Sequence, residues 1–286
     1  MGIIERLTSQ ENAFSLEFFP PKKDMPMSSV YDAIGRLAQS HPAFVSVTYG
    51  AGGGNRERTL EVVSEVERIG LEAIAHLTCV GADHAAMADI LDTLEQNGVK
   101  NVLALRGDIP EGMDADTAFL HYRHASDLIT EIKRRPGFTV AAAAYPESHV
   151  QSIGMDQDIE IMKLKASLGT DFFVTQLCFN TCAVVELFER LDKEGIKTPV
   201  VVGIMPVLNP KQIIRMSLLS ACSIPAPLSK IISLYGEKPE EFKKAGLEYA
   251  VRQISLLMEY NINKFHLYTM NKADEIEQLL THSGLA

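Results

Sequence analysis

The sequence lacks any long apolar run, which argues against a membrane-spanning helix. Its longest apolar runs, such as residues 199–206, fall far short of the roughly 18 apolar residues that such a helix needs. The first residues lack the apolar core of a secretory signal peptide, and no Ser or Thr stands at the sixth position, where an N-myristoylation motif requires one. We therefore expect a cytoplasmic protein without a membrane partner.

Basic charge, cysteine and metal-ligand motifs are also scarce. The 27 Lys and Arg residues stand against 37 Asp and Glu, a net charge of −10 without a basic run, so we expect no nucleic-acid partner. The four cysteines form no CxxC pair, and we expect reduced thiols rather than a disulfide framework. Neither an HxH or HExxH spacing nor a GxSxG elbow occurs, so we expect neither a metal site nor a serine nucleophile.

What the sequence does contain is a regular alternation of strand and helix signals. Eight short apolar runs each precede an amphipathic stretch, and their continuous apolarity suits strands buried on both faces of a parallel sheet. An open doubly wound sheet would also fit, but eight strands in 286 residues favour an α/β fold with one (β/α)8 TIM-type barrel domain spanning residues 1–286. The predicted strands are residues 13–19, 44–49, 73–78, 102–105, 139–145, 172–177, 200–205 and 264–268.

Glycine and proline mark where the helices begin and end. Glycines at positions 70, 98, 169 and 195 close four helical segments just before the next strand, at positions suited to a left-handed backbone. Asn209-Pro210 predicts a helix start, and Pro239 opens a long helix through about residue 260. Residues 224–227 look like an inserted turn. The sequence therefore predicts one extra helix between strands seven and eight.

Polar residues gather at the carboxyl ends of the predicted strands, where barrels of this type place their active sites. Glu17 lies inside an apolar run, and we expect burial to raise its pKa toward use as a general acid. Glycine in Arg106-Gly107-Asp108 would allow a ligand close to the backbone, although a simple turn or a surface salt bridge fits too.

For other residues a functional role and a structural role both stay open. His76 and Gln176 could contact a ligand or could satisfy neighbouring backbone groups. Lys165 is expected, from its residue type and its place on a helix, to be a solvated lysine. The glycine-rich run 50–55 could bind phosphate or form a substrate loop, and it matches neither GxGxxG nor a Walker motif.

Taken together, seven of these segments resemble the bacterial methylenetetrahydrofolate reductase family. In order from Phe14 to Lys272 they read SLEFFPP, VSVTYG, HLTC, ALRGD, AYPESH, TQ and FHLYTMN. Members of that family have a (β/α)8 barrel with noncovalently bound FAD, and they reduce 5,10-methylenetetrahydrofolate to 5-methyltetrahydrofolate, commonly with NADH. The resemblance therefore implies a flavin-dependent oxidoreductase of one-carbon metabolism that serves methionine synthesis.

The resemblance also implies roles for individual residues. Glu17 would be the general acid that protonates the folate N10, and Asp108 the second catalytic carboxylate, which stabilises the cationic iminium. Positions that match substrate contacts are Glu17, Thr48, Asp108, Gln176, Gln212, Tyr268 and Lys272. Positions that match FAD contacts are Thr48, Tyr49, Ala51, His76, Arg106, Gly107, Asp108, Ala125, Tyr145, His149, Asp158 and Lys165.

Two departures from the family pattern bear on the substrate and the partners. Lys272 stands where the family often has arginine, and Met216 where relatives have a stacking phenylalanine. Rival interpretations are another flavin barrel, such as one similar to proline dehydrogenase, and a flavin-holding subunit that receives electrons from a partner protein. We expect methylenetetrahydrofolate and NAD(P)H as substrates and a homo-oligomer, with the choice between NADH and NADPH left open.

Overall fold

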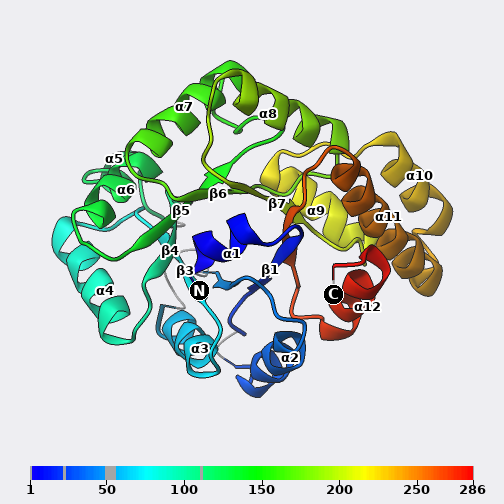
Figure 1. Ribbon diagram of the computed structural model, residues 1–286, viewed down its shortest axis with the longest axis horizontal. Coiled ribbons are helices and arrows are strands. Elements are labelled where there is room, and N and C mark those ends of the chain that lie inside the picture. The colour runs from blue at the N-terminus through cyan, green and yellow to red at the C-terminus, as the bar shows by residue number, and fades with distance from the viewer. Residues whose placement is uncertain (1, 22–23, 49–55, 110–111, 286) are drawn as a thin grey trace.

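The structure is a computed structural model that describes residues 2–21, 24–48, 56–109 and 112–285. Its eight strands form a closed parallel barrel in sequence order, with β8 pairing with β1 (Figure 1). This confirms the predicted (β/α)8 fold, and every strand lies within its predicted range apart from β4, which begins one residue earlier. The strands are β1 (Ala13–Phe18), β2 (Val45–Val47), β3 (Ala73–Thr78), β4 (Asn101–Leu105), β5 (Thr139–Ala144), β6 (Phe172–Thr175), β7 (Val200–Ile204) and β8 (Lys264–Tyr268).

The helices that follow the strands pack their apolar stripes onto the outside of the barrel. Met87, Leu91 and Leu94 of α4 are fully buried, as their helical spacing predicts. The four predicted helix-closing glycines all have positive φ, between 68° and 102°. These helices are α2 (Ser28–Ala38), α3 (Arg56–Arg68), α4 (His84–Gln96), α5 (Ala115–Ala118), α6 (Ala125–Lys133), α7 (Met155–Ser167), α8 (Thr181–Lys193) and α12 (Ala273–Ser283).

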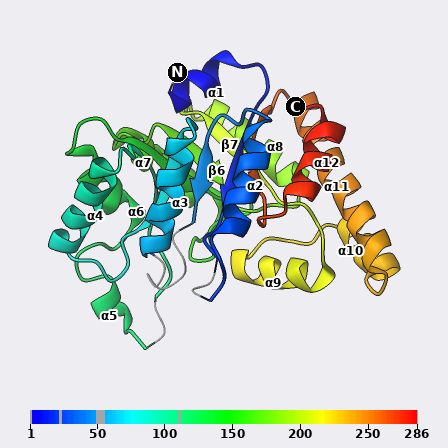
Figure 2. The same ribbon diagram turned by 90° about the horizontal axis from the view of Figure 1, so that it is seen from below.

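A short helix, α1 (Ile3–Ser9), closes the amino-terminal end of the barrel. Its Ile3 and Leu7 are buried in a cluster with Phe44 of the segment before β2 and Phe172 of β6. Figure 1 shows α1 across the centre of the barrel, and Figure 2 shows it at the end opposite to α9. Since this end is filled with apolar side chains, access to the barrel interior is from the carboxyl ends of the strands.

The connection between β7 and β8 differs from the prediction of a single extra helix. It contains three helices, α9 (Pro210–Ser220), α10 (Ala226–Tyr235) and α11 (Pro239–Glu259), so two are additional. The predicted turn at residues 224–227 is the start of α10. Proline is tolerated in the first helical turn, where the missing N–H has no intrahelical partner, and the buried Leu228 holds the new helix against the core.

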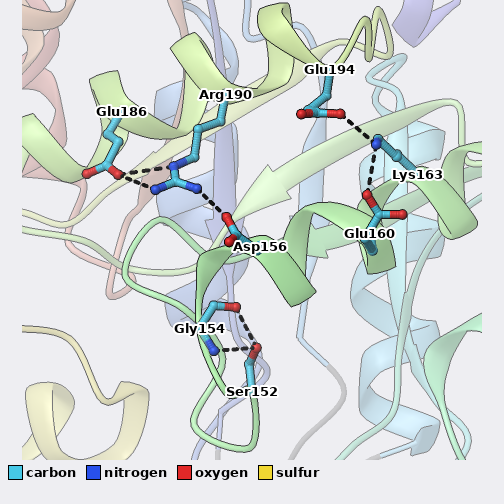
Figure 3. Close-up of polar contacts among 8 residues, drawn as sticks. All are labelled: Ser152, Gly154, Asp156, Glu160, Lys163, Glu186, Arg190 and Glu194. Atoms are coloured by element: carbon cyan, nitrogen blue, oxygen red, sulfur yellow. Dashed lines mark hydrogen bonds and ion pairs between the residues drawn. The ribbon is translucent and has the colours of Figure 1, made fainter.

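On the outer surface, six charged residues join α7 to α8 (Figure 3). Arg190 contacts Asp156 at 2.6 Å and Glu186 at 2.9 Å. Lys163 contacts Glu160 at 2.8 Å and Glu194 at 2.7 Å. We call Asp156, Glu160, Lys163, Glu186, Arg190 and Glu194 the α7–α8 ion-pair cluster.

Two further findings bear on the expected class of protein. All four cysteines are free thiols, as the sequence predicts. In the part of the chain that the structure describes, no helix combines the length and the apolar character needed to cross a membrane.

Candidate active site

Two neighbouring cavities lie at the carboxyl ends of the strands. An inner cavity of about 270 Å³ opens over the barrel axis, and an outer cavity of about 440 Å³ lies between β4, β5, α6 and α7. Leu105, Ala143 and Tyr145 line both. Predicted site residues in the inner cavity are Glu17, Thr48, His76, Tyr145, Gln176 and Tyr268, and those in the outer cavity are Arg106, Ala125, Tyr145, His149, Asp158 and Lys165.

Glu17, near the end of β1, lies between two imidazoles in the wall of the inner cavity. Its Oε2 is 3.3 Å from Nε2 of His266 and 3.5 Å from Nε2 of His76, and its side chain is only 17% exposed. Burial acts to raise the pKa of Glu17, but the hydrogen bond from His266 and the electrostatic contributions of His76 and His266 outweigh it. The net effect lowers the pKa, so our expectation of a raised value is wrong for the free protein.

The two histidines beside Glu17 differ in their bonding. His266 of β8 is completely buried and contacts Ser15 Oγ at 2.7 Å through Nδ1 and Ser46 Oγ at 3.2 Å through Nε2. His76 of β3 is also buried, yet its Nε2 has no hydrogen-bond partner. Burial lowers the pKa of His76 to about 4, so at neutral pH its ring is uncharged. An unpaired imidazole nitrogen at a cavity wall is available to a ligand.

Tyr268 and Gln176 also line the inner cavity. The Tyr268 hydroxyl donates to Thr175 O at 2.9 Å, and the backbone N–H of Leu177 donates to Gln176 Oε1 at 2.7 Å. Burial and the negative charge of Glu17 hold the pKa of Tyr268 well above its ordinary value, so this hydroxyl stays a hydrogen-bond donor. A Cβ at Gly203 would lie 2.6 Å from the Tyr268 hydroxyl, and glycine there makes room for the ring.

The outer cavity contains cationic groups and a helix N-terminus. Lys165 is only 7% exposed and donates to Ala143 O at 2.9 Å, so the expectation of a solvated lysine is wrong. Burial lowers its pKa to about 8, which leaves the ammonium mostly charged at pH 7. Arg106 lines the same cavity and is bonded to Gln151. Ala125, the first residue of α6, adds the positive end of a helix dipole.

A buried carboxylate and an aromatic pair complete the outer cavity. Asp158 accepts a hydrogen bond from the backbone N–H of His149 at 3.1 Å, and it is buried beside Lys165. The Tyr145 and His149 rings meet edge to face with centroids 4.7 Å apart. Burial, together with the positive charge of Arg106, lowers the pKa of His149, and burial raises the pKa of Tyr145. These contacts fix the loop after β5 against α7.

Several predicted site residues lie outside both cavity linings. Asp108 is exposed at the end of β4, where its charge acts on Tyr145 and His149. Gly107 has φ of +85°, and a Cβ there would lie 2.6 Å from Val80, so this glycine is needed for packing between the loops after β3 and β4. Gln212 lies half-buried on α9, Lys272 is the exposed N-cap of α12, and Tyr49 and Ala51 fall outside the described residues.

Sequence reasoning missed part of each lining. In the inner cavity it missed Met205 and Met270, and it named Met216 only as a departure, although that side chain lines the cavity from α9. In the outer cavity it missed His124, Ser126, Gln151, Ser152 and Gln157. Their position in the sequence could have identified them, because all five lie in loops or at helix starts that follow β4 and β5. Among the described residues, no group of three or more His, Cys, Asp or Glu side chains could hold a metal ion.

Comparisons with known proteins cover nearly the whole chain. The family model described as methylenetetrahydrofolate reductase matches residues 3–284. The chain is 33% identical over 261 residues to 5,10-methylenetetrahydrofolate reductase of Escherichia coli, covering 91% of this chain and 86% of that protein. It is also 33% identical over 296 residues to methylenetetrahydrofolate reductase (NADH) 1 of Arabidopsis thaliana, covering 99% of this chain but only half of the plant protein.

A solved structure shares the architecture. An uncharacterized protein from Clostridium thermocellum, described as binding two copies of 5-methyl-5,6,7,8-tetrahydrofolic acid, matches with a TM-score of 0.68. The match covers 98% of this chain and 96% of that one. Its sequence identity of 14% means that the likeness concerns the fold alone.

Proposed function

The chain belongs to the methylenetetrahydrofolate reductase family and is an oxidoreductase, and from this premise we propose that it reduces 5,10-methylenetetrahydrofolate to 5-methyltetrahydrofolate with FAD and NADH. The observation that carries the proposal is Glu17, a carboxylate in the wall of the inner cavity, beside an outer cavity that holds Arg106 and Lys165. An acid beside one cavity and cations in the next suit a redox reaction that needs a proton and an anionic cofactor.

The described residues fit FAD. Arg106, the buried Lys165 and the N-terminus of α6 would hold its diphosphate, because charged donors and free backbone N–H groups recognise phosphate oxygens. The unpaired Nε2 of His76 offers a hydrogen bond to a polar edge of the flavin ring. When bound, FAD supplies hydride transfer from NADH to the folate.

The protein itself would bind the substrate and supply a proton. Glu17 protonates the folate N10, which opens the five-membered ring to an iminium, and Asp108, exposed after β4, stabilises that cation. Gln176, Tyr268 and Thr48 orient the pterin and, in turn, the nicotinamide, so that both substrates use the inner cavity alternately. Such alternation gives ping-pong kinetics. The remaining folate contacts are Gln212 and Lys272, whose positions on α9 and α12 suit the substrate's tail.

An absorption spectrum followed by anaerobic mixing tests the proposal. The purified chain should be yellow, bleach on addition of NADH and regain its colour when methylenetetrahydrofolate is added. A colourless protein that takes up no FAD would overturn the flavin assignment. A yellow protein that dithionite bleaches but NADH does not would favour an electron-transferring partner subunit. A protein that NADH bleaches but that methylenetetrahydrofolate leaves colourless acts on another substrate.

A further inference from the structure

Barrel closure places a fully buried polar group directly behind Glu17. The register of β1 against β8 pairs Ser15 with His266 and Glu17 with Tyr268, while β2 pairs Ser46 with Glu17. Side chains two apart on a strand share a face, so Ser15 and Glu17 point to the same side, and the contacts of His266 show that this side is the barrel interior. His266 is 0% exposed, and the proposed reaction gives it no role so far.

The hydrogen bonds of His266 define its tautomer. Nε2 lies 3.3 Å from Glu17 Oε2 and 3.2 Å from Ser46 Oγ. A carboxylate only accepts hydrogen bonds, so Nε2 carries the hydrogen and shares it between these two oxygens. Nδ1 lies 2.7 Å from Ser15 Oγ, and the same hydroxyl donates to Phe265 O at 3.2 Å. Ser15 therefore fixes the orientation of the imidazole, with Nε2 directed at Glu17.

We propose that His266 is the positioning residue for the general acid Glu17, and that its Nε2–H stabilises the carboxylate left behind when the proton moves to the substrate. This inference rests on the proposed function. In the step, the O–H bond of Glu17 breaks, an N–H bond forms at the substrate nitrogen, and the electron pair stays on the carboxylate. A donor aimed at that carboxylate is worth more in a buried site than in water.

The other groups that face Glu17 are less suited to this role. His76 from β3 approaches to 3.5 Å but forms no hydrogen bond, and its Nε2 stays available to a ligand. Tyr268 from β8 donates its hydroxyl hydrogen to Thr175 O instead. Among the described residues, His266 is thus the group whose hydrogen bond fixes the Glu17 carboxyl.

Infrared titration of the free protein tests this without substrate or cofactor. The protonated carboxyl band of Glu17 is isolated as the difference between the ¹³C-glutamate-labelled protein and its Glu17→Gln variant. In His266→Leu, loss of the donor should move the midpoint to a proton concentration roughly tenfold lower, that is, to higher pH. His266→Gln, whose amide can donate from the same region, should restore much of the difference. An unchanged midpoint in His266→Leu overturns the proposal.

Two serine variants keep the proposal testable if His266→Leu does not fold. Ser15→Ala removes the contact that orients the imidazole, and it should raise the pH of the midpoint by less than His266→Leu. Ser46→Ala removes the competing acceptor, and it should leave the midpoint unchanged or lower its pH. A shift of the same sign and size in both variants would show general disturbance of the barrel and overturn the assignment.

The pH profile of folate reduction separates this inference from the proposed function. The rate needs protonated Glu17, so in His266→Gln and Ser15→Ala the alkaline limb should follow the infrared midpoint, with kcat reduced and NADH oxidation by an artificial acceptor retained. A protein that shows the infrared shifts but does not reduce methylenetetrahydrofolate would refute the proposed function and leave the Glu17–His266 pairing intact. Folate reduction with unchanged infrared midpoints would support the proposed function and refute the Glu17–His266 pairing.

Discussion

Glu17 and the carboxylates of the α7–α8 ion-pair cluster are both paired, but their surroundings differ. Asp156 in the cluster has a side chain 95% exposed and faces the permanent cation of Arg190 (Figure 3). The side chain of Glu17 is 17% exposed and faces two imidazoles inside the barrel. Exposed ion pairs are screened by water and contribute little, whereas a buried carboxylate depends on each of its partners.

The same contrast holds between two lysines of α7. Hydrogen bonds to Glu160 and Glu194 raise the pKa of Lys163 on the surface, while burial lowers the pKa of Lys165 to about 8 in the outer cavity. The two positions are two residues apart, so opposite faces of one helix serve different purposes. The outer face joins helices through charge pairs, and the inner face presents a charged donor to a cavity.

The sharpest test of this contrast replaces one carboxylate from each region. Glu17→Gln should lower the rate of folate reduction by roughly 10²–10⁴-fold, the usual contribution of a general acid, and leave NADH oxidation by an artificial acceptor nearly unchanged. Glu186→Gln, which removes a partner of Arg190 on the surface, should change neither rate. Equal loss of both half-reactions in Glu17→Gln would show that Glu17 is not the acid.

The next largest effect is expected on FAD binding, from substitution of the two lysines of α7. Lys165→Met should weaken FAD binding by roughly 10- to 100-fold, because it removes a charged hydrogen-bond donor from the outer cavity. Lys163→Met, on the same helix, should leave FAD affinity unchanged. Equilibrium dialysis of both apoproteins against FAD measures the difference. Equal affinities would move the diphosphate site away from α7.

The fold could be predicted from the sequence because its signals are local. A strand buried on both faces is a nearly continuous apolar run, and residues 172–175 and 200–204 show this without any knowledge of their neighbours. The wrong prediction of a turn at the start of α10 also has a local cause. Two prolines near its start resemble a turn, and the apolar residues that follow, including the buried Leu228, are the signal that a helix continues.

The candidate site was predicted less completely because closure of the barrel decides its chemistry. Glu17 and His266 are separated by 249 residues, and only the pairing of β8 with β1 brings them together. The apolar context of Glu17 suggested a raised pKa, whereas two histidines from distant strands lower it. Lys165 illustrates the same limit, since burial of a helix residue depends on which face the barrel covers.

A third test uses the acid stability of the free protein. The pKa of His76 is lowered from 6.5 to about 4 by burial, so the unfolded chain takes up a proton on this ring at higher pH than the folded one. The free energy of unfolding should therefore fall as the pH drops from 6.5 to 4, by on the order of 3 kcal/mol from this group. His76→Gln should show a flatter dependence in urea titrations across that window, and His282→Gln, at an exposed position, should match the wild type. Parallel curves for wild type and His76→Gln would mean that His76 is not held neutral.

The smallest effect is expected for Arg190 on the surface. Arg190→Gln removes the contact to Asp156 that joins α8 to the first turn of α7, together with the contact to Glu186 within α8. If such exposed pairs only add screened attraction, the melting temperature should change by no more than about 2 °C, and FAD affinity and kcat should stay within about twofold. Because α7 also carries Asp158 and Lys165 on its inner face, a tenfold loss of FAD affinity in Arg190→Gln would show that the surface cluster sets the position of the cavity wall. The two faces of α7 would then be coupled. Raising the salt concentration should in that case weaken FAD binding to the wild type in the same way as the substitution.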